Sequence, residues 1–406
     1  MTAKETSLTP TIDLEGLGLA QGAHLLLQRA LRQLPVGGRL TVAGRDPPLA
    51  VHLAAWCRER GYGFEAAPPG NDGSRAAGTI VRTDYEAQRW RGAERGGGPR
   101  PEDVVGRPNP KWGLAARGAL VEEGGPDAGF DLDEKQAVWT DLAPRLYAQA
   151  AASQWDPASV DWGAMGDMPE DVEAAVVQVM TYLVENEQAA LVVPARFLGR
   201  IHPHFREVVQ FLAVQIADEA RHAEVFARRA GLHGAGLGVS TVGGRASLTT
   251  LLEEPDFSLA SFLLSVLGEG TFLNLLSFLE THAPDGVTRQ ITRLARQDET
   301  RHVGFAMAHL EYQITMEPEL RSRLRAAVER RYDALKATTG LAEEVFDSLV
   351  ILAAGSWEPS AIAAGYAAVS ALGVDMAEGR ERRLLRLGFP SSEASALAAL
   401  HTRNFM

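Results

Sequence analysis

The sequence predicts a multidomain protein: a small two-layer α/β sandwich in the order βαβαββ, followed by an all-α helical bundle. Three observations predict this fold class. Strand and helix patterns alternate as far as Asp84, residues 85–131 are dense in glycine and proline, and long helical periodicities follow without convincing strand alternation. We therefore expect an α/β domain over 1–84, a linker and irregular wrap over 85–131, and a helical domain over 132–406.

The N-terminal elements follow from residue patterns between turn signals. Strands are expected at 10–16, 38–44, 63–68 and 77–84, and helices at 20–35 and 46–62. The first helix is amphipathic, and the second is expected to open at Asp46 and Pro47.

The stretch LEGLGLAQGAHLLLQRALRQLPVGGRLTVAGRDPPLAVHLAAWCRERGYGF resembles a TusA-type sulfur-carrier domain. The shared features are the Leu-x-Gly-Leu opening, the first helix, the Pro-Gly turn region, the Asp-Pro start of the second helix and the later Gly-Tyr. The family's sulfur-bearing Cys-Pro falls on Leu19 and Ala20, so the nucleophile is missing. Cys57 lies on the apolar side of the second helix, which indicates a packed core thiol. We expect this domain to dock a protein partner or to form a homodimer.

Composition narrows the class of protein. A net charge of −12 argues against nucleic acid or an anionic membrane as the main partner. The most apolar region, SLASFLLSVLGEGTFLNLLSFL, is interrupted by glycine, glutamate and asparagine, so we expect no membrane span. The first residues contain no apolar signal core, and we expect a cytoplasmic protein. With one cysteine, any metal must be held by oxygen and nitrogen ligands.

The motif Asp-Glu-x-Arg-His occurs twice in the helical region, once ending at His222 and once at His302. In each copy the glutamate, Glu219 or Glu299, stands three positions before the histidine, so both side chains lie on one helix face. A single Glu-x-x-His is usually a solvated charged face. By composition, one chance match to the longer motif is expected in only roughly a few chains per thousand. Two copies therefore indicate one metal site rather than two charged faces.

Hairpin symmetry locates a partner for the first motif. Glu219 follows Pro203 at the same sequence separation at which Glu187 precedes it. Equal distances from the turn of an antiparallel helix pair place two residues at the same height. Glu187 also stands on an apolar face, where a carboxylate is costly unless it is paired or bound to metal. Glu185 is the alternative ligand from this helix, on a more polar face.

The same symmetry about Pro284 locates the fourth carboxylate. Glu269 precedes Pro284 by as many positions as Glu299 follows it, and Glu269 again stands on an apolar face. Pro284 itself is expected in the first turn of the helix.

The predicted ligands are two single glutamates and two Glu-x-x-His pairs from four helices. They are Glu187, Glu219, His222, Glu269, Glu299 and His302. Four carboxylates balance two divalent ions, and these residues would act in catalysis through the metal centre. Asp218 and Asp298 are candidates to accept the second ring N–H of a ligand histidine.

Residues 165–312, with a metal-binding four-helix core at about 168–312, resemble the di-iron carboxylate oxidases and oxygenases of the ferritin-like superfamily. The resemblance rests on both Asp-Glu-x-Arg-His runs and on GEGTF around Glu269, which matches that family's Glu-Gly-x-x-Phe. It implies two Fe ions, or a Mn/Fe pair, with O2 as co-substrate.

The predicted function is an O2-activating non-haem di-iron oxidase or oxygenase that hydroxylates, desaturates or N-oxygenates a small organic substrate. It would need an external electron donor. The alternatives are a non-catalytic ferritin-like metal-binding protein, a radical generator like a ribonucleotide reductase small subunit, and a sulfur-trafficking or tRNA-modification protein recruited through the TusA-like domain.

Other histidines are weaker candidates. His202 and His204 in GRIHPHF are expected in a surface loop at the hairpin turn, and His309 is expected to have a packing role.

Overall fold

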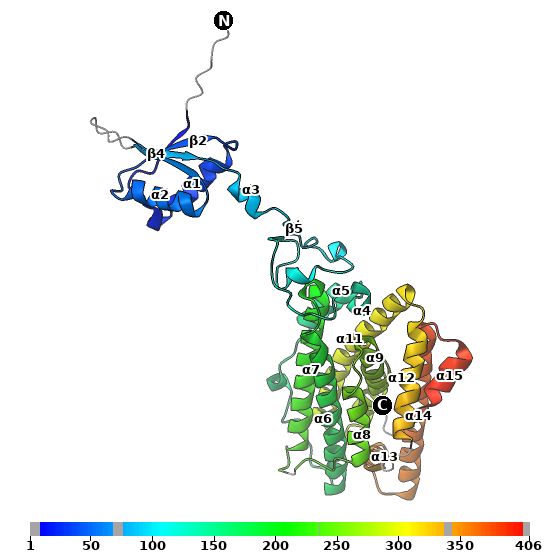
Figure 1. Ribbon diagram of the computed structural model, residues 1–406. Coiled ribbons are helices and arrows are strands. Elements are labelled where there is room, and N and C mark those ends of the chain that lie inside the picture. Colours follow the sequence, from blue (N-terminus) through cyan, green and yellow to red (C-terminus); the bar gives the residue numbers. More distant parts are fainter. Residues whose placement is uncertain (1–8, 68–75, 235, 337–342, 401–406) are drawn as a thin grey trace. The chain divides into compact units, whose positions relative to one another are not determined.

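The computed structural model describes residues 9–67, 76–234, 236–336 and 343–400. The chain divides into two compact units, Met1–Arg95 with Leu120–Gly125, and Gly96–Ala119 with Pro126–Met406. The first is a small α/β unit and the second is a helical bundle (Figure 1), so the predicted fold class is confirmed.

The α/β unit has the predicted βαβαββ order. Its elements are β1 (Thr11–Asp13), α1 (Ala23–Arg32), β2 (Arg39–Ala43), α2 (Leu49–Glu59), β3 (Gly63–Ala66) and β4 (Ala76–Val81). The sheet order is β1-β2-β4-β3, with β1 parallel to β2 and the other two pairs antiparallel. Both helices begin later than predicted. Gly22, at a left-handed φ of 100°, separates α1 from a short turn at Leu19–Gln21. Two consecutive prolines disfavour helical geometry before Leu49.

Cys57 is a core residue, as predicted. It is fully buried among the apolar side chains of this unit. Burial raises the pKa of its thiol to about 12, so the thiol stays neutral at physiological pH.

The segment between the two predicted domains holds only short elements. They are α3 (Tyr85–Arg89), β5 (Glu94–Arg95), η2 (Pro101–Asp103), η3 (Pro110–Trp112) and β6 (Leu120–Val121). Strands β5 and β6 pair in a two-stranded antiparallel ladder within the α/β unit.

The expectation of a surface loop for His202 and His204 is wrong. Both side chains are buried. Trp112 packs against the ring of His204, and Phe130 packs against the ring of His202. The Nε2 of His204 accepts the Val105 N–H at 3.1 Å. Arg117 donates to the His204 carbonyl at 3.0 Å and forms a buried ion pair of 2.6 Å with Glu207. His204 therefore helps to fasten the glycine-rich segment to the bundle.

The bundle has two long antiparallel hairpins and further helices around them. Its elements are α4 (Lys135–Val138), α5 (Ala143–Ala152), η4 (Pro157–Ser159), α6 (Glu170–Leu198), η5 (Pro203–Phe205), α7 (Arg206–Ala230), α8 (Val242–Leu252), α9 (Phe257–Ser261), η6 (Phe262–Glu269), α10 (Gly270–His282), α11 (Gly286–Met316), α12 (Leu320–Leu335), α13 (Glu343–Ala354), α14 (Pro359–Arg386) and α15 (Ser391–Ala399). Helices α6 and α7 form the first hairpin. The continuous α9–η6–α10 helix and α11 form the second, and all of them share one apolar core.

Pro284 precedes the helix instead of opening it. Helix α11 begins at Gly286 with Asp285 as its N-cap, because the Asp285 carboxylate accepts the Thr288 N–H at 2.8 Å. The turn between α10 and α11 still lies at Pro284, so Glu269 and Glu299 remain equally far from it along the chain. His309 is fully buried and contacts Ser258 Oγ and the Trp139 carbonyl, so its predicted packing role is confirmed.

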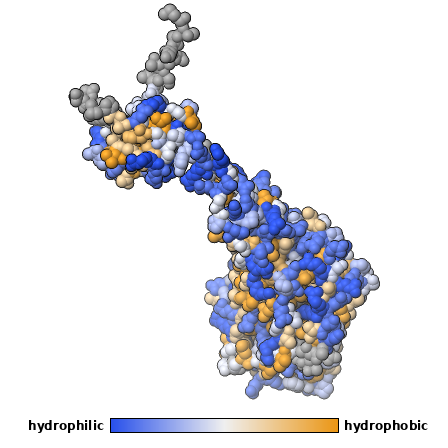
Figure 2. Space-filling view, viewed as in Figure 1, coloured by the Kyte–Doolittle hydropathy of each residue, from blue (hydrophilic) through white to orange (hydrophobic). Residues whose placement is uncertain are grey.

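By length and composition alone, two helices could cross a membrane: Phe257–His282 and Pro359–Arg386. The first is a core helix of the bundle, with 78% of its apolar window buried, while 22% of the second window is buried. Polar and apolar side chains mix on the visible face of the bundle (Figure 2).

A buried arginine joins three helices of the bundle. Arg229 on α7 pairs with Glu173 on α6 at 2.8 Å and with Asp285 at the start of α11 at 2.9 Å. Its guanidinium is fully buried, and the two carboxylates keep its pKa above the ordinary value although burial opposes this.

Replacing Arg229 should destabilise the bundle strongly. Arg229→Ala leaves two buried carboxylates unpaired, and we expect the free energy of unfolding to fall by about 3–5 kcal/mol. Denaturant unfolding followed by circular dichroism measures this loss. Arg228→Ala is the control: Arg228 is exposed and stacks on Trp162, so its loss should cost about 1 kcal/mol or less. Equal losses would contradict the assignment.

Candidate metal centre

The two hairpins bring the six predicted ligands together in the bundle core. The carboxylates come from α6, α7, η6 and α11, and the histidines come from α7 and α11. None of the six side chains is more than 5% exposed. Because an isolated buried carboxylate is costly, four of them in one place indicate that a cation belongs there.

The cluster divides into two overlapping groups of possible ligands. The groups are Glu187, Glu219, His222 and Glu299, and Glu219, Glu269, Glu299 and His302. Within each group, one ligand atom per residue lies within 4.8 Å of the others. Glu219 and Glu299 belong to both groups. The arrangement therefore has two positions for a metal ion, with two carboxylates shared between them.

Hydrogen bonds orient both imidazoles toward the carboxylates. The Nε2 of His222 lies 3.1 Å from Asp298 Oδ2, and the Nε2 of His302 lies 3.2 Å from Asp218 Oδ2. An aspartate at Nε2 favours the proton there and leaves the Nδ1 lone pair for a metal. Each Nδ1 faces the glutamates: His222 Nδ1 is 3.2 Å from Glu219, and His302 Nδ1 is 3.0 Å from the same residue.

The aspartates act across the two motifs. Asp218 belongs to the first motif and contacts the histidine of the second, and Asp298 does the reverse. Arg221 and Arg301 each pair with the aspartate of their own helix. Arg221 also lies 3.4 Å from Asp298. Each copy of the motif thus supplies a Glu-His pair that faces the metal position. Each copy also supplies an aspartate that holds the histidine of the other copy.

Glu187 lies in the cluster, and Glu185 does not. Glu187 is buried and its Oε2 is 3.6 Å from His222 Nδ1. Glu185 is partly exposed and faces α8, with its Oε2 3.9 Å from the position that a Cβ on Gly244 would take. The ligand role of the six residues stays a prediction.

Charges inside the cluster are strongly coupled. Burial, together with the neighbouring Glu219 and Glu299, raises the pKa of Glu187 and of Glu269 well above the ordinary value. Burial opposes ionisation of Glu219 as well, but His302 and His222 lower its pKa. The two outer carboxylates therefore favour protonation until a cation replaces the proton.

Unpaired oxygens fit the same interpretation. Among the described residues, Glu187 Oε1 and Glu269 Oε2 are buried and accept no hydrogen bond. Buried oxygens of this kind are rare without a ligand. The donor set of carboxylates and imidazoles suits Fe or Mn.

A π-helix carries Glu269. The eight residues of η6 (Phe262–Glu269) interrupt an otherwise α-helical rod, and all eight are buried. Such π segments often occur at functional sites, because the wider turn redirects one side chain. Glu269 is the last residue of this segment. Spacing about Pro284 predicts a carboxylate at Glu269, but sequence spacing carries no information on this backbone geometry.

Three supporting residues were missed by the sequence reasoning. Trp155 donates to Asp298 Oδ2 at 2.8 Å, and Gln154 donates to Asp218 Oδ1 at 2.9 Å. Gln215, one helical turn before Glu219, lies 3.4 Å from Glu269 Oε1. Only Gln215 leaves a signal in sequence, because a polar residue one turn before a ligand shares its buried face.

Four helices in two antiparallel hairpins, each presenting a carboxylate to one internal layer, form a ferritin-like bundle.

No protein-family model matches the sequence, and no curated protein matches it. Several solved structures are similar to the chain. One is a mutant R2-like ligand-binding oxidase with an aerobically reconstituted Mn/Fe cofactor (TM-score 0.47, 16% identity, 61% of this chain and 95% of that one). Another mutant of such an oxidase carries an aerobically reconstituted Fe/Fe cofactor (TM-score 0.47, 16% identity, 61% and 94%). A third structure, an R2-like ligand-binding oxidase after a long soak, carries Mn/Fe (TM-score 0.47, 17% identity, 61% and 93%).

The number of metal ions bound per chain should distinguish the glutamates that belong to both ligand groups from those that belong to one. After anaerobic Fe(II) loading, elemental analysis should give about two ions per chain for the native protein. Because Glu219 and Glu299 belong to both groups, Glu219→Ala and Glu299→Ala should bind almost none. Glu187→Ala should retain about one ion. Glu185→Ala is the matched control on the same helix and should keep both, so an equal loss in that variant would overturn the ligand assignment.

The crossed aspartates should tune metal affinity. Asp298→Asn keeps the shape but weakens the hold on His222, and we expect metal affinity to fall by about 10–100-fold. Competition with a chelator measures this. Trp155→Phe removes only one donor to the same carboxylate and should have a smaller effect. An Asp298→Asn protein with native affinity would contradict the orienting role.

Proposed function

We propose that the helical unit is an O2-activating oxidoreductase with a dinuclear Fe/Fe or Mn/Fe centre that acts on a small organic substrate. The observation that carries the proposal is the pair of overlapping ligand groups that share Glu219 and Glu299. When bound, two redox-active ions would supply the electrons and the oxidising power for O2 chemistry.

The protein's own residues would position and insulate that chemistry. The crossed aspartates hold the imidazoles at fixed orientations, and the shared carboxylates hold the two ion positions close together. The apolar core around the cluster excludes water, which protects a reactive centre from side reactions. Both carboxylates outside the shared pair can take up a proton, since their pKa values are raised.

Hydroxylation, desaturation and N-oxygenation all suit such a centre, and each would draw on an external electron donor. Helices α12, α13, α14 and α15 lie outside the two hairpins, and residues of η6, α12, α14 and α15 enclose a pocket. A protein that only stores metal has no need of such additions, so they favour an enzyme over a non-catalytic ferritin-like protein. For the N-terminal unit, which lacks the TusA-type cysteine, we propose docking of a partner or dimerisation.

Oxygen consumption distinguishes the enzyme from the metal store. The Fe(II)-loaded protein should consume O2 repeatedly when a reductant is supplied, as measured with an oxygen electrode. Glu219→Ala should abolish consumption, and Glu185→Ala should retain it. A single stoichiometric burst that no reductant can renew would favour the non-catalytic alternative.

A further inference from the structure

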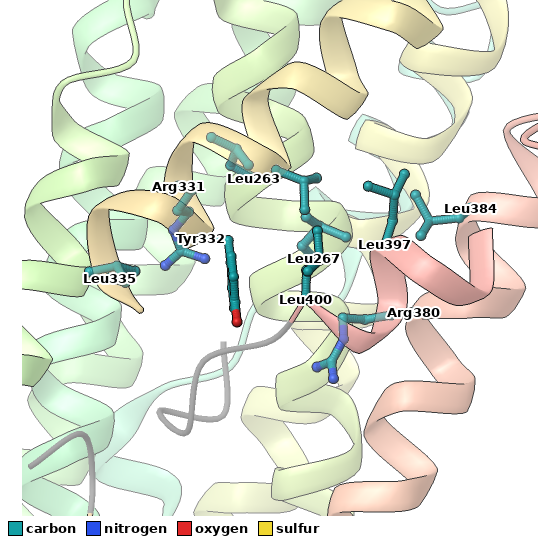
Figure 3. Close-up of a pocket in the computed structure, with 10 residues that line it drawn as sticks. Leu263, Leu267, Arg331, Tyr332, Leu335, Arg380, Leu384, Leu397 and Leu400 are labelled. Atoms are coloured by element: carbon teal, nitrogen blue, oxygen red, sulfur yellow. The ribbon is translucent and has the colours of Figure 1, made fainter. Parts of the chain in front are cut away.

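A groove open to solvent lies on the bundle between α10, α11 and α14, and none of the six metal-centre residues lines it. It has about 370 Å³ of free space. The pocket between η6, α12, α14 and α15 is much smaller. Its free space of about 30 Å³ holds about two water molecules, and Figure 3 shows Tyr332 between Arg331 and Arg380. Of these two spaces, only the groove can receive the side chains of a partner.

The walls of the groove combine apolar and cationic side chains. Leu273 on α10 and Val303 and Met307 on α11 supply apolar surface. One face of α14 supplies three arginines: Arg382, Arg383 and Arg386. No carboxylate is among the described residues that line the groove. Arginine and methionine are enriched in protein interfaces, while lysine and the acidic residues are depleted there, so this lining is typical of a surface that another protein covers.

Arg383 has no carboxylate partner among the described residues. Its Nε and Nη2 are buried and lack a hydrogen-bond partner. Burial, together with the nearby Arg380 and Arg382, lowers its pKa to about 10, so the side chain stays charged at physiological pH. The guanidinium lies against the backbone of Gly270, where a Cβ would be 2.6 Å from Cζ. A largely buried charge without a partner favours an anionic group beside it.

The other two arginines have partners that they can exchange. Arg382 pairs with Glu378 at 3.3 Å, and Arg386 pairs with Glu311. The two arginine side chains are 66% and 60% exposed. Exposed ion pairs contribute little to stability, so both arginines can turn to carboxylates of a docked protein at little cost.

The groove lies on the outer side of the helices that carry the metal-centre residues. Its lining residues Gly270 and Val303 directly follow Glu269 and His302 along the chain. Glu269 and His302 are buried in the core, whereas the groove is open to solvent, so they are separated by one helix, which is about 10 Å thick. A carrier protein docked in the groove would hold its redox group close to the cluster.

We propose that this groove docks the external electron donor, an acidic carrier protein whose carboxylates pair with the three arginines and whose apolar side chains pack in the groove. This inference rests on the proposed oxidase function and adds the class of the partner and its place of docking. Because the net charge of the chain is −12, most of its surface repels an acidic partner. The arginine face of α14 would therefore fix where the partner binds and in which orientation.

The carrier would supply the electrons that an O2-dependent hydroxylation requires. One oxygen atom enters a C–H bond of the substrate, and the other takes up two electrons and two protons and leaves as water. Two reduced carriers, docking in turn, would each lose one electron.

Binding of a small acidic ferredoxin tests the docking surface. Full-length protein is stripped of metal with a chelator and titrated calorimetrically with the oxidised ferredoxin, so that the result does not depend on oxidase activity. We expect binding that weakens as salt is added, and Arg382→Glu and Arg383→Met should each weaken it by at least about tenfold. Arg293→Glu is the matched control, because Arg293 is exposed on α11, does not line the groove, and its replacement changes the net charge as Arg382→Glu does.

Stopped-flow reduction tests the electron transfer. The Fe(III)-loaded protein is mixed, without O2, with reduced ferredoxin or with a neutral hydroquinone. Arg382→Glu should slow reduction by ferredoxin by at least about tenfold and leave reduction by hydroquinone unchanged, since the small reductant needs no docking surface. Thermal unfolding confirms that the variant is folded, as expected for an exposed side chain.

Three results would overturn the proposal: no binding of ferredoxin to the native protein, equal losses in Arg382→Glu and Arg293→Glu, and a native dimer that Arg382→Glu dissociates in sedimentation. The last would assign the groove to a second copy of the chain. The proposed oxidase function fails separately. Ferredoxin binding that depends on Arg382, in a protein that does not consume O2, would support the docking surface and contradict only the oxidase.

Discussion

The structure of the helical unit depends on accommodating a cluster of ionisable side chains in an apolar core. Four carboxylates and two imidazoles lie where each alone would be penalised by burial. The bundle tolerates them because they face one another and because aspartates and arginines behind them complete a network. A cation is the natural centre of that network. The apolar residues around it then set how much water can reach the site.

The α/β unit and the bundle treat a reactive side chain in opposite ways. Cys57 is buried with its thiol pKa raised, which removes reactivity. The metal-centre groups are equally buried, but their pKa values shift in opposite directions. The pKa of Glu187 is raised, whereas neighbouring histidines lower the pKa of Glu219. Burial alone therefore does not indicate function. Opposite pKa shifts in neighbouring buried groups do indicate a functional site.

Much of this arrangement could be predicted from sequence, because helical periodicity and hairpin symmetry are local geometry. The βαβαββ order, the two hairpins and the convergence of the six side chains followed from spacing about two turns. Contacts between distant segments could not be predicted this way. The buried histidines at Pro203, the π-helix before Gly270, and the donors Gln154 and Trp155 depend on tertiary packing that spacing does not encode. The late starts of α2 and α11 reflect proline and capping chemistry at single positions.

The crossed hydrogen bonds between the two motifs have a consequence for how such a centre can change. The hairpins are related by an approximate twofold repeat, which suggests two equivalent halves. Yet each aspartate serves the histidine of the opposite half, and Glu219 and Glu299 serve both ion positions. Neither half is thus a complete unit. A substitution that adapts one motif alters the environment of both ions, so the two copies must vary together.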